Sequence, residues 1–256
     1  MGGKVRVRKM SQDRKRYFES MNKKNMCVLI HSPLVGPLTW KLVAEEMRQR
    51  SIDVIVPTLV DAPDSEAPYW KQHAESVSQA LAQVSQDTPL TLVAHSGTGP
   101  LLPAIRESLA NPVNAYVFVD AGIPLDGATR LDLMNSEDSD WSKQFQEYLE
   151  SGGHFPDWSF DDLQEIIPDD ELRAQTVAEI RPRALEFFIE PIPVFDGWPD
   201  APCVYILFSE PYKRAAVQAR ESGWPTYELE AGHFHMLVDA NAVTNLILEA
   251  VNKSIG

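Results

Sequence analysis

The sequence predicts an α/β fold in which a mostly parallel central sheet carries helices on both faces. Short apolar runs of strand length alternate with segments of helical periodicity through the first half of the chain. This order is typical of parallel strands joined by right-handed crossovers. Residues 89–105 add a serine at the turn between a buried run and a helical run. Because no Gly/Ser-rich or Pro-rich linker divides the 256 residues, we expect one large domain.

The first half of the chain supplies most of the predicted sheet. Met26 to His31 is an apolar run rich in branched residues, as a central parallel strand requires. The segment that follows has Trp40, Val43, Ala44 and Met47 at helical spacing. By the same criteria, further strands are expected at 52–56, 90–93 and 115–119, and further helices at 69–84 and after residue 100.

The alternation breaks after residue 123 and resumes near residue 200. Residues 124–199 mix aromatic side chains with acidic residues and prolines, which indicates a mostly helical cap inserted into the sheet domain. We therefore expect the core to comprise 1–123 and 200–256. Two late strands, at 204–208 and 226–229, and a closing amphipathic helix at 242–251 complete the predicted domain.

Charge and cysteine usage restrict the class of protein. The net charge of −14 argues against general nucleic-acid binding. Basic residues concentrate before residue 25, where the period-two pattern of residues 4–18 predicts a solvated edge hairpin. There is no apolar run of membrane-spanning length and none typical of a signal peptide. Together with two cysteines in strand-like runs, Cys27 and Cys203, these features predict a cytoplasmic protein with free thiols.

The serine at the centre of the pattern is Ser96, in Ala94-His95-Ser96-Gly97. A serine hydroxyl is a weak nucleophile, so it has to project from the sheet edge towards a base. A strand, a sharp turn and a helix accomplish this, and the helix also directs free N–H groups at developing negative charge. This layout resembles the nucleophile elbow of the α/β-hydrolases. The family's usual glycines two residues either side of the serine are here Ala94 and Thr98.

The base predicted by this resemblance is His233, in a Gly-His loop before the closing helix. The chain order, serine and then histidine, is the order found in α/β-hydrolases. A histidine near its ordinary pKa can accept the serine proton and return it to a leaving group. His235, two residues later, is the competing candidate.

Two carboxylates end strands before His233. Asp120 ends the strand after the elbow unit, and Glu210 ends the next. Most α/β-hydrolases place the acid at the later position. In the methylesterase and hydroxynitrile lyase branch, the expected aspartate position corresponds to Pro211. We therefore favour Asp120 as the residue that orients His233, with Glu210 as the alternative.

The resemblance also predicts an oxyanion hole. One donor is expected from the Gly97 N–H. The loop from His31 to Trp40 resembles the His-Gly-x-x-x-Gly-x-x-x-Trp loop of the same branch, but its donor position corresponds to Pro33, which has no N–H. Leu34 N–H is expected to replace it, with Ser32 as a further possibility and an incomplete hole as the third. The predicted substrate pocket comprises His31, Ser32, Pro33, His95, Trp158 and Phe234.

The implied function is a cofactor-free serine hydrolase that cleaves a small or medium carboxylic ester through an acyl-enzyme. Two alternatives stay open: a hydroxynitrile-lyase-like enzyme on the same site, and a non-catalytic small-molecule binder on a hydrolase fold. No dinucleotide fingerprint, phosphate loop or clear metal-ligand spacing occurs in the sequence. The expected partner is a small ester, without nucleic acid or membrane, and the chain is expected to be a monomer or homodimer.

Overall fold

The computed structural model describes residues 25–62, 64–137 and 139–255. The hairpin predicted for residues 4–18 lies outside this range. The strands are β1 (Met26–Ile30), β2 (Val54–Ile55), β3 (Leu90–Ser96), β4 (Val113–Ala121), β5 (Cys203–Leu207) and β6 (Thr226–Glu228). The α-helices are α2 (Leu38–Gln49), α3 (Tyr69–Ala80), α4 (Leu102–Glu107), α5 (Arg130–Glu137), α6 (Ser139–Glu150), α7 (Asp170–Ala178), α8 (Leu185–Ile189), α9 (Lys213–Glu221) and α10 (Ala240–Ile255).

The six described strands form one sheet in the order β2-β1-β3-β4-β5-β6, and every neighbouring pair is parallel. The first described strand, β1, lies next to the edge strand β2, and β3 to β6 follow one another from β1 to the opposite edge. The predicted α/β architecture is confirmed. The edge strand β2, predicted at 52–56, is the strand that the structure shortens most, to Val54–Ile55.

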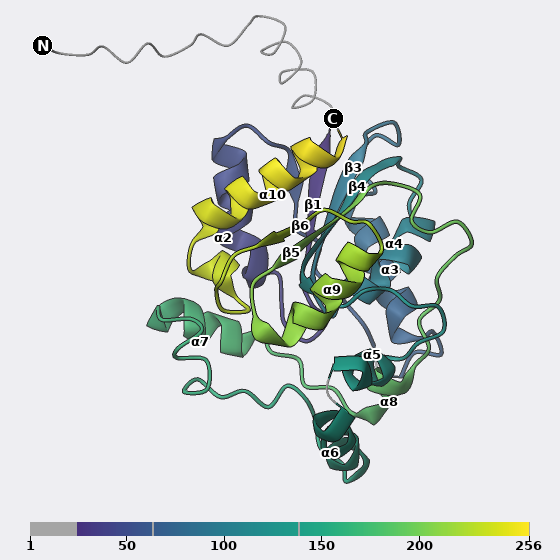
Figure 1. Cartoon of the computed structure of the whole chain (residues 1–256), viewed down its shortest axis with the longest axis vertical. Coiled ribbons are helices and arrows are strands. Elements are labelled where there is room, and N and C mark those ends of the chain that lie inside the picture. The colour runs from purple at the N-terminus through teal and green to yellow at the C-terminus, as the bar shows by residue number, and fades with distance from the viewer. Residues whose placement is uncertain (1–24, 63, 138, 256) are drawn as a thin grey trace, which may run out of the picture.

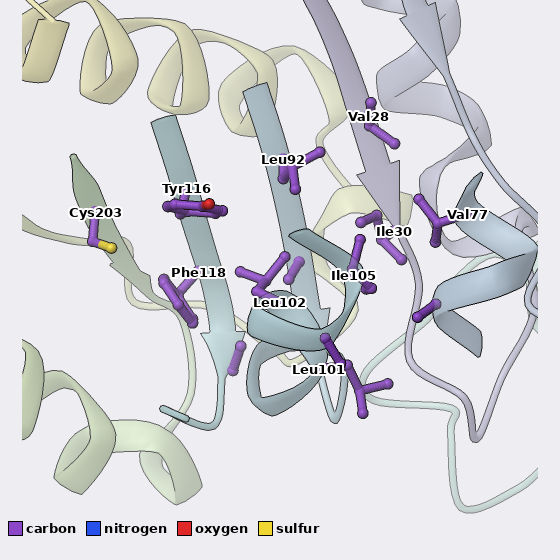
Figure 2. Close-up of a cluster of buried hydrophobic side chains, with 14 of the residues drawn as sticks. Val28, Ile30, Val77, Leu92, Leu101, Leu102, Ile105, Tyr116, Phe118 and Cys203 are labelled. Carbon is purple, nitrogen blue, oxygen red and sulfur yellow. The ribbon is translucent and has the colours of Figure 1, made fainter. Parts of the chain in front are cut away.

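Helices cover both faces of the sheet (Figure 1). On one face α2 and α10 pack against the strands, and on the other face lie α3, α4 and α9. Each face of the sheet has its own apolar core, and consecutive strand residues alternate between these two cores. Leu92 and Phe118 face the α4 side, whereas Val93 and Val119 face the α2 side. Figure 2 shows the first of these clusters, with Leu101, Leu102 and Ile105 packed over the strands.

Four helices, α5 to α8, lie between β4 and β5 in the chain. A small apolar cluster of Leu131, Phe145, Leu149, Phe187 and Phe188 holds part of this segment together. In Figure 1, α5, α6 and α8 gather at one end of the sheet, while α7 lies apart near α2. The division into a core and a cap at residues 124–199 stays a prediction.

The segment between β4 and β5 is tied to the loop that follows β1. Glu179 accepts a hydrogen bond from Leu38 N–H at 2.9 Å and so caps the first turn of α2, which has no side-chain cap of its own. Arg181 N–H donates to the Leu34 carbonyl at 2.9 Å. A β-carbon at Gly36 would collide with the Glu179 side chain, so this close approach requires glycine. Residues just after α7 therefore hold the loop after β1 in place.

Candidate active site

Ser96 stands at a strained turn at the carboxyl end of β3. Its φ is 58°, a left-handed conformation that costs free energy for any residue with a β-carbon. The short 3₁₀ turn Gly99–Leu101 and then α4 begin directly after it. A β-carbon at Gly99 would collide with the carbonyl oxygen of Gly122 after β4. The turn therefore depends on glycine at 99, one residue beyond the position that the family pattern gives to glycine.

Thr98 occupies the position where the family pattern has glycine, and its side chain has a specific partner. Thr98 is fully buried, and its hydroxyl donates a hydrogen bond to the carbonyl oxygen of His31. This bond links the turn after Ser96 to the end of β1. The departure from the pattern therefore adds a contact between the elbow and the loop after β1.

His233 and Asp120 lie together beside the elbow. His233 Nδ1 is 2.7 Å from Asp120 Oδ2. Because a carboxylate only accepts, Nδ1 carries the proton, and Nε2 is left with a free lone pair. The His233 ring also lies against the ring of His95, the residue before Ser96, at 4.3 Å between centroids. Within the described chain, however, no hydrogen bond joins His233 to the Ser96 hydroxyl.

Asp120 is completely buried at the end of β4, and its own φ is 45°. Its Oδ1 accepts hydrogen bonds from the main-chain N–H groups of Phe208 at 2.9 Å and Ser209 at 3.0 Å, just after β5. Its Oδ2 accepts from the Ser209 hydroxyl in addition to His233. Three donors from the next strand thus compensate the burial of the charge and hold the carboxylate at one angle.

The alternative candidates face elsewhere. Glu210 has a side chain that is 78% exposed, and it forms an ion pair with Lys213 one turn further along the chain. His235 packs its ring edge-on against Phe208, at 6.0 Å between centroids. Neither side chain has a described contact with Ser96 or with the His233–Asp120 pair. The structure therefore brings together Ser96, His233 and Asp120, and leaves Glu210 and His235 apart from them.

His95 is in direct contact with His233. His95 is fully buried, and its Nε2–H donates to the main-chain carbonyl oxygen of His233 at 3.0 Å. Its Nδ1 has no hydrogen-bond partner among the described residues. Burial, reinforced by the nearby His233, lowers the pKa of His95 well below its ordinary value. The neutral ring thus supports the main chain of the candidate base and does not face open space.

Tyr212 is the residue at this site that the sequence analysis missed. Its hydroxyl oxygen lies 2.9 Å from Ser96 Oγ. Its ring stacks on the imidazole of His233, with centroids 5.0 Å apart and planes 7° from parallel. Tyr212 ends the short 3₁₀ turn Glu210–Tyr212 before α9. A tyrosine after Glu210-Pro211 carries no local pattern, and only the proximity of that turn to β3 reveals it.

In the loop after β1, the Leu34 N–H has a partner within the loop. Leu34 N–H donates to Ser32 Oγ at 3.4 Å, so it is directed at a side chain of its own loop. Ser32 Oγ accepts this bond and retains its own proton for another acceptor. It lies close to Gly97: a β-carbon at 97 would be 3.3 Å from Ser32 Oγ. The Ser32 hydroxyl thus lies close to Gly97, while Pro33 has no N–H to donate.

His31 holds this loop in place. Its Nδ1–H donates to the Ser32 carbonyl at 2.8 Å, and its Nε2 accepts from Leu59 N–H at 3.2 Å. The residue is fully buried, and this burial is the main cause that lowers the pKa of His31 to about 4. Both ring nitrogens are thus occupied by main-chain groups, and His31 links the loop after β1 to the segment at Leu59.

Aromatic rings extend from His233 into the segment between β4 and β5. Phe234 lies 5.2 Å from the His233 ring, Trp158 lies 5.9 Å from Phe234, and Phe155 lies 5.5 Å from Trp158. A groove of about 280 Å³ adjoins Phe155. Its lining consists of Trp141, Gln144, Phe145, Tyr148, Phe155 and Asp157. Trp158 and Phe234, both predicted pocket residues, are thus the rings that connect this groove with His233.

A buried charge cluster joins Arg183, between α7 and α8, to Asp61 and His73. Arg183 binds both oxygens of Asp61, at 2.7 and 2.6 Å, and His73 Nε2 is 2.8 Å from Asp61 Oδ2. Burial alone would raise the pKa of Asp61, but the hydrogen bonds from His73 and Arg183 outweigh it and lower that pKa. The pKa of His73 is lowered mainly by burial. Asp61 and Arg183 are therefore an ion pair that links the helical segment to the sheet domain.

Other kinds of site find little support in the part of the chain that the structure describes. No group of three or more His, Cys, Asp or Glu side chains there is arranged to hold a metal ion. Cys27 and Cys203 are buried free thiols, and burial raises the pKa of each to about 12. Among the described helices, none has both the length and the apolar character needed to cross a membrane.

The fold is shared with solved structures at low sequence identity. An extracellular α/β-hydrolase from a Paenibacillus species, described as homologous to tobacco salicylic acid binding protein 2, is 18% identical, with a TM-score of 0.70 over 88% of this chain and 98% of its own. A tomato methylketone synthase I variant complexed with β-ketoheptanoate is 15% identical, with a TM-score of 0.67 over 90% and 99%. A pyrethroid hydrolase from Sphingobium faniae JZ-2 is 16% identical, with a TM-score of 0.64 over 89% and 97%. No curated protein matches the sequence.

A family model matches most of the chain directly. The match covers residues 27–245, which includes β1 to β6, the elbow, the helical segment and the loop of His233. It agrees with the all-parallel sheet and its covering helices. The chain belongs to the alpha/beta hydrolase family.

Proposed function

We propose that this protein is a serine hydrolase that cleaves a small or medium carboxylic ester through an acyl-enzyme. The observation that carries the proposal is the His233–Asp120 pair, 2.7 Å apart, beside a serine on a strained turn. Structural strain and a buried, oriented carboxylate cost free energy, and proteins concentrate such features at functional sites.

In the proposed reaction, the Ser96 proton passes to His233 Nε2 while Oγ forms a bond to the ester carbonyl carbon. The carbonyl π electrons move onto oxygen, which becomes the oxyanion. Collapse of this intermediate breaks the bond to the alcohol, which leaves with the proton from His233. Water then repeats the sequence on the acyl-enzyme and releases the carboxylic acid. Asp120 keeps the Nδ1–H tautomer and stabilises the imidazolium.

The structure differs from this arrangement in one hydrogen bond, because the Ser96 hydroxyl pairs with Tyr212 and not with His233. Catalytic hydrogen bonds are often formed only when substrate binds, so this geometry is compatible with the proposal. Gly97 N–H and the Ser32 hydroxyl are the proposed oxyanion donors. Ser32 replaces Leu34 in this role because Leu34 N–H is directed at Ser32 itself.

The lyase and binder alternatives have weaker support. A hydroxynitrile lyase is expected to have a positive charge near the serine, but three arginines of the helical segment are already paired: Arg130 with Glu190, Arg173 with Asp170, and Arg183 with Asp61. A non-catalytic binder does not require the buried His233–Asp120 pair. The size class of the ester, the monomeric or homodimeric state and the cytoplasmic location stay predictions.

Labelling with a fluorophosphonate tests the proposal. We expect one mole of label per mole of protein, located on Ser96 by peptide mass spectrometry. Ser96→Ala should lose both the label and ester turnover. The exposed Ser65, changed to alanine, serves as the control and should retain both. Label on another serine, or undiminished turnover in Ser96→Ala, would contradict the proposal.

A further inference from the structure

The candidate oxyanion hole lacks one main-chain donor. Pro33 stands where the resemblance places a donor and has no N–H. The next N–H in the loop, that of Leu34, is directed at Ser32 Oγ. Removing one donor from such a hole typically lowers kcat by about 10²–10³. An efficient hydrolase with this loop would thus benefit from a donor on another element.

Tyr212 supplies a hydroxyl at the reacting atom. Its oxygen is 2.9 Å from Ser96 Oγ, which is hydrogen-bonding distance. Within the tetrahedral intermediate, Oγ and the oxyanion are bonded to the same carbon. A donor at hydrogen-bonding distance from one is therefore a short rotation from the other. A neutral phenol can donate one hydrogen bond without introducing a charge.

The ring of Tyr212 is restrained before substrate arrives. It stacks nearly parallel on the His233 imidazole, and His233 is in turn held by Asp120 and by the ring of His95. Tyrosine has only two side-chain torsions that matter for placing its hydroxyl. A donor that is already positioned needs little reorganisation in the transition state, which is the condition under which electrostatic stabilisation is most effective.

We propose that Tyr212 is a catalytic residue whose phenolic hydroxyl donates a hydrogen bond to the oxyanion, in addition to the Gly97 N–H and the Ser32 hydroxyl proposed above. This inference rests on the proposed ester hydrolysis. As Oγ bonds to carbon and its proton moves to His233, the Tyr212 hydroxyl transfers its hydrogen bond from Oγ to the new oxyanion. Tyr212 keeps its proton throughout, so the overall balance of the reaction is unchanged.

A competing role for Tyr212, as a cover over Ser96, predicts the opposite change in the reaction rate of Ser96. If the phenol only covers Ser96, its removal would expose the nucleophile, and Tyr212→Ala would react faster with a small reagent. If the phenol is a donor, Tyr212→Phe would react more slowly although the ring and its stacking on His233 are retained. Two variants at one position therefore separate the two roles.

The experiment measures ester hydrolysis and the rate of fluorophosphonate labelling for wild type, Tyr212→Phe and Tyr212→Ala. We expect Tyr212→Phe to lower kcat by about 10²–10³ with little change in KM, and to slow labelling of Ser96 as well. Inhibition by phenylboronic acid, which forms a tetrahedral adduct on serine, should weaken by a similar factor. Tyr227→Phe, on β6, is the matched control and should behave as wild type.

The outcomes are distinguishable. Suppose that wild type is labelled at Ser96 and hydrolyses esters, but that Tyr212→Phe retains full kcat or is labelled faster. This result would overturn the role of Tyr212 and leave the hydrolase assignment standing. A wild-type protein that neither labels at Ser96 nor turns over esters would overturn the hydrolase assignment and this inference with it. Thermal unfolding of Tyr212→Phe should match wild type, because the half-buried ring is retained.

Discussion

The side chain of His95 donates a hydrogen bond from Nε2 to the main-chain carbonyl oxygen of His233, 138 residues later in the chain. The residue before the candidate nucleophile thus holds the backbone of the candidate base. Because the two rings are also in contact, at 4.3 Å between centroids, a shift of one displaces the other. Strand β3 therefore positions both partners of the proposed proton transfer.

His95→Phe should lower kcat by roughly a hundredfold with little change in KM, since small displacements of a catalytic group have costs of that order. Phenylalanine retains the ring but lacks the donor to the His233 carbonyl. His95→Gln, which restores an N–H near the same place, should recover most of the activity. Steady-state kinetics on one ester measures all three proteins. Equal kcat in His95→Phe and wild type would contradict the positioning role.

Asp120→Asn should leave the fold intact and lower kcat by roughly 10⁴, because the amide favours the wrong His233 tautomer. Its remaining oxygen can still accept from Phe208 and Ser209 N–H. Glu210→Gln is the matched control at the neighbouring strand end. It should stay within about tenfold of wild type, since Glu210 faces solvent and Lys213. If Glu210→Gln proves to be the inactive variant, Asp120 is not the acid.

Thr98→Val should destabilise the protein by about 1–3 kcal/mol, the cost of leaving a buried acceptor without its donor. The shape of the side chain is nearly unchanged, so packing contributes little to the expected effect. Thr98→Ser keeps the hydroxyl that bonds the His31 carbonyl and should lose less. Urea unfolding at constant pH gives both free energies. A Thr98→Val variant as stable as wild type would show that the hydroxyl contributes nothing.

Stability should fall as the pH drops from about 6.5 towards 4. Burial lowers the pKa of His31 from 6.5 to about 4, so in this window the unfolded chain binds a proton that the folded chain does not. For this one residue the loss is roughly 2 kcal/mol at pH 5. Urea unfolding at pH 5 and at pH 6 gives the change in the free energy of unfolding with pH. This change should be smaller by about 1.2 kcal/mol per pH unit in His31→Gln than in wild type. An equal change in both proteins would mean that His31 does not contribute to it.

Much of the fold follows from the local sequence. Apolar runs of strand length and helical spacing identify β1, β3, β4, β5 and the helices between them, because burial on both faces of a parallel sheet leaves a pattern in each strand separately. Ser96 and His233 could be singled out in the same way, since a serine between strand and helix and a Gly-His loop before the last helix are local features. The limits were less well predicted for β2, which is shorter than expected, and for β3 and β4, which are longer.

The tertiary structure decided what depends on residues far apart in the chain. Both Asp120 and Glu210 were predicted to end strands, and only the fold shows that Asp120 is directed at His233, 113 residues away, while Glu210 pairs with Lys213. The sequence likewise did not predict three contacts: the hydrogen bond from Thr98 to His31, the one from Leu34 N–H to Ser32, and the one between Tyr212 and Ser96. The physical reason is that local propensity and burial patterns determine which segments form strands and helices, whereas the direction of a polar side chain depends on the donors and acceptors that packing brings to it.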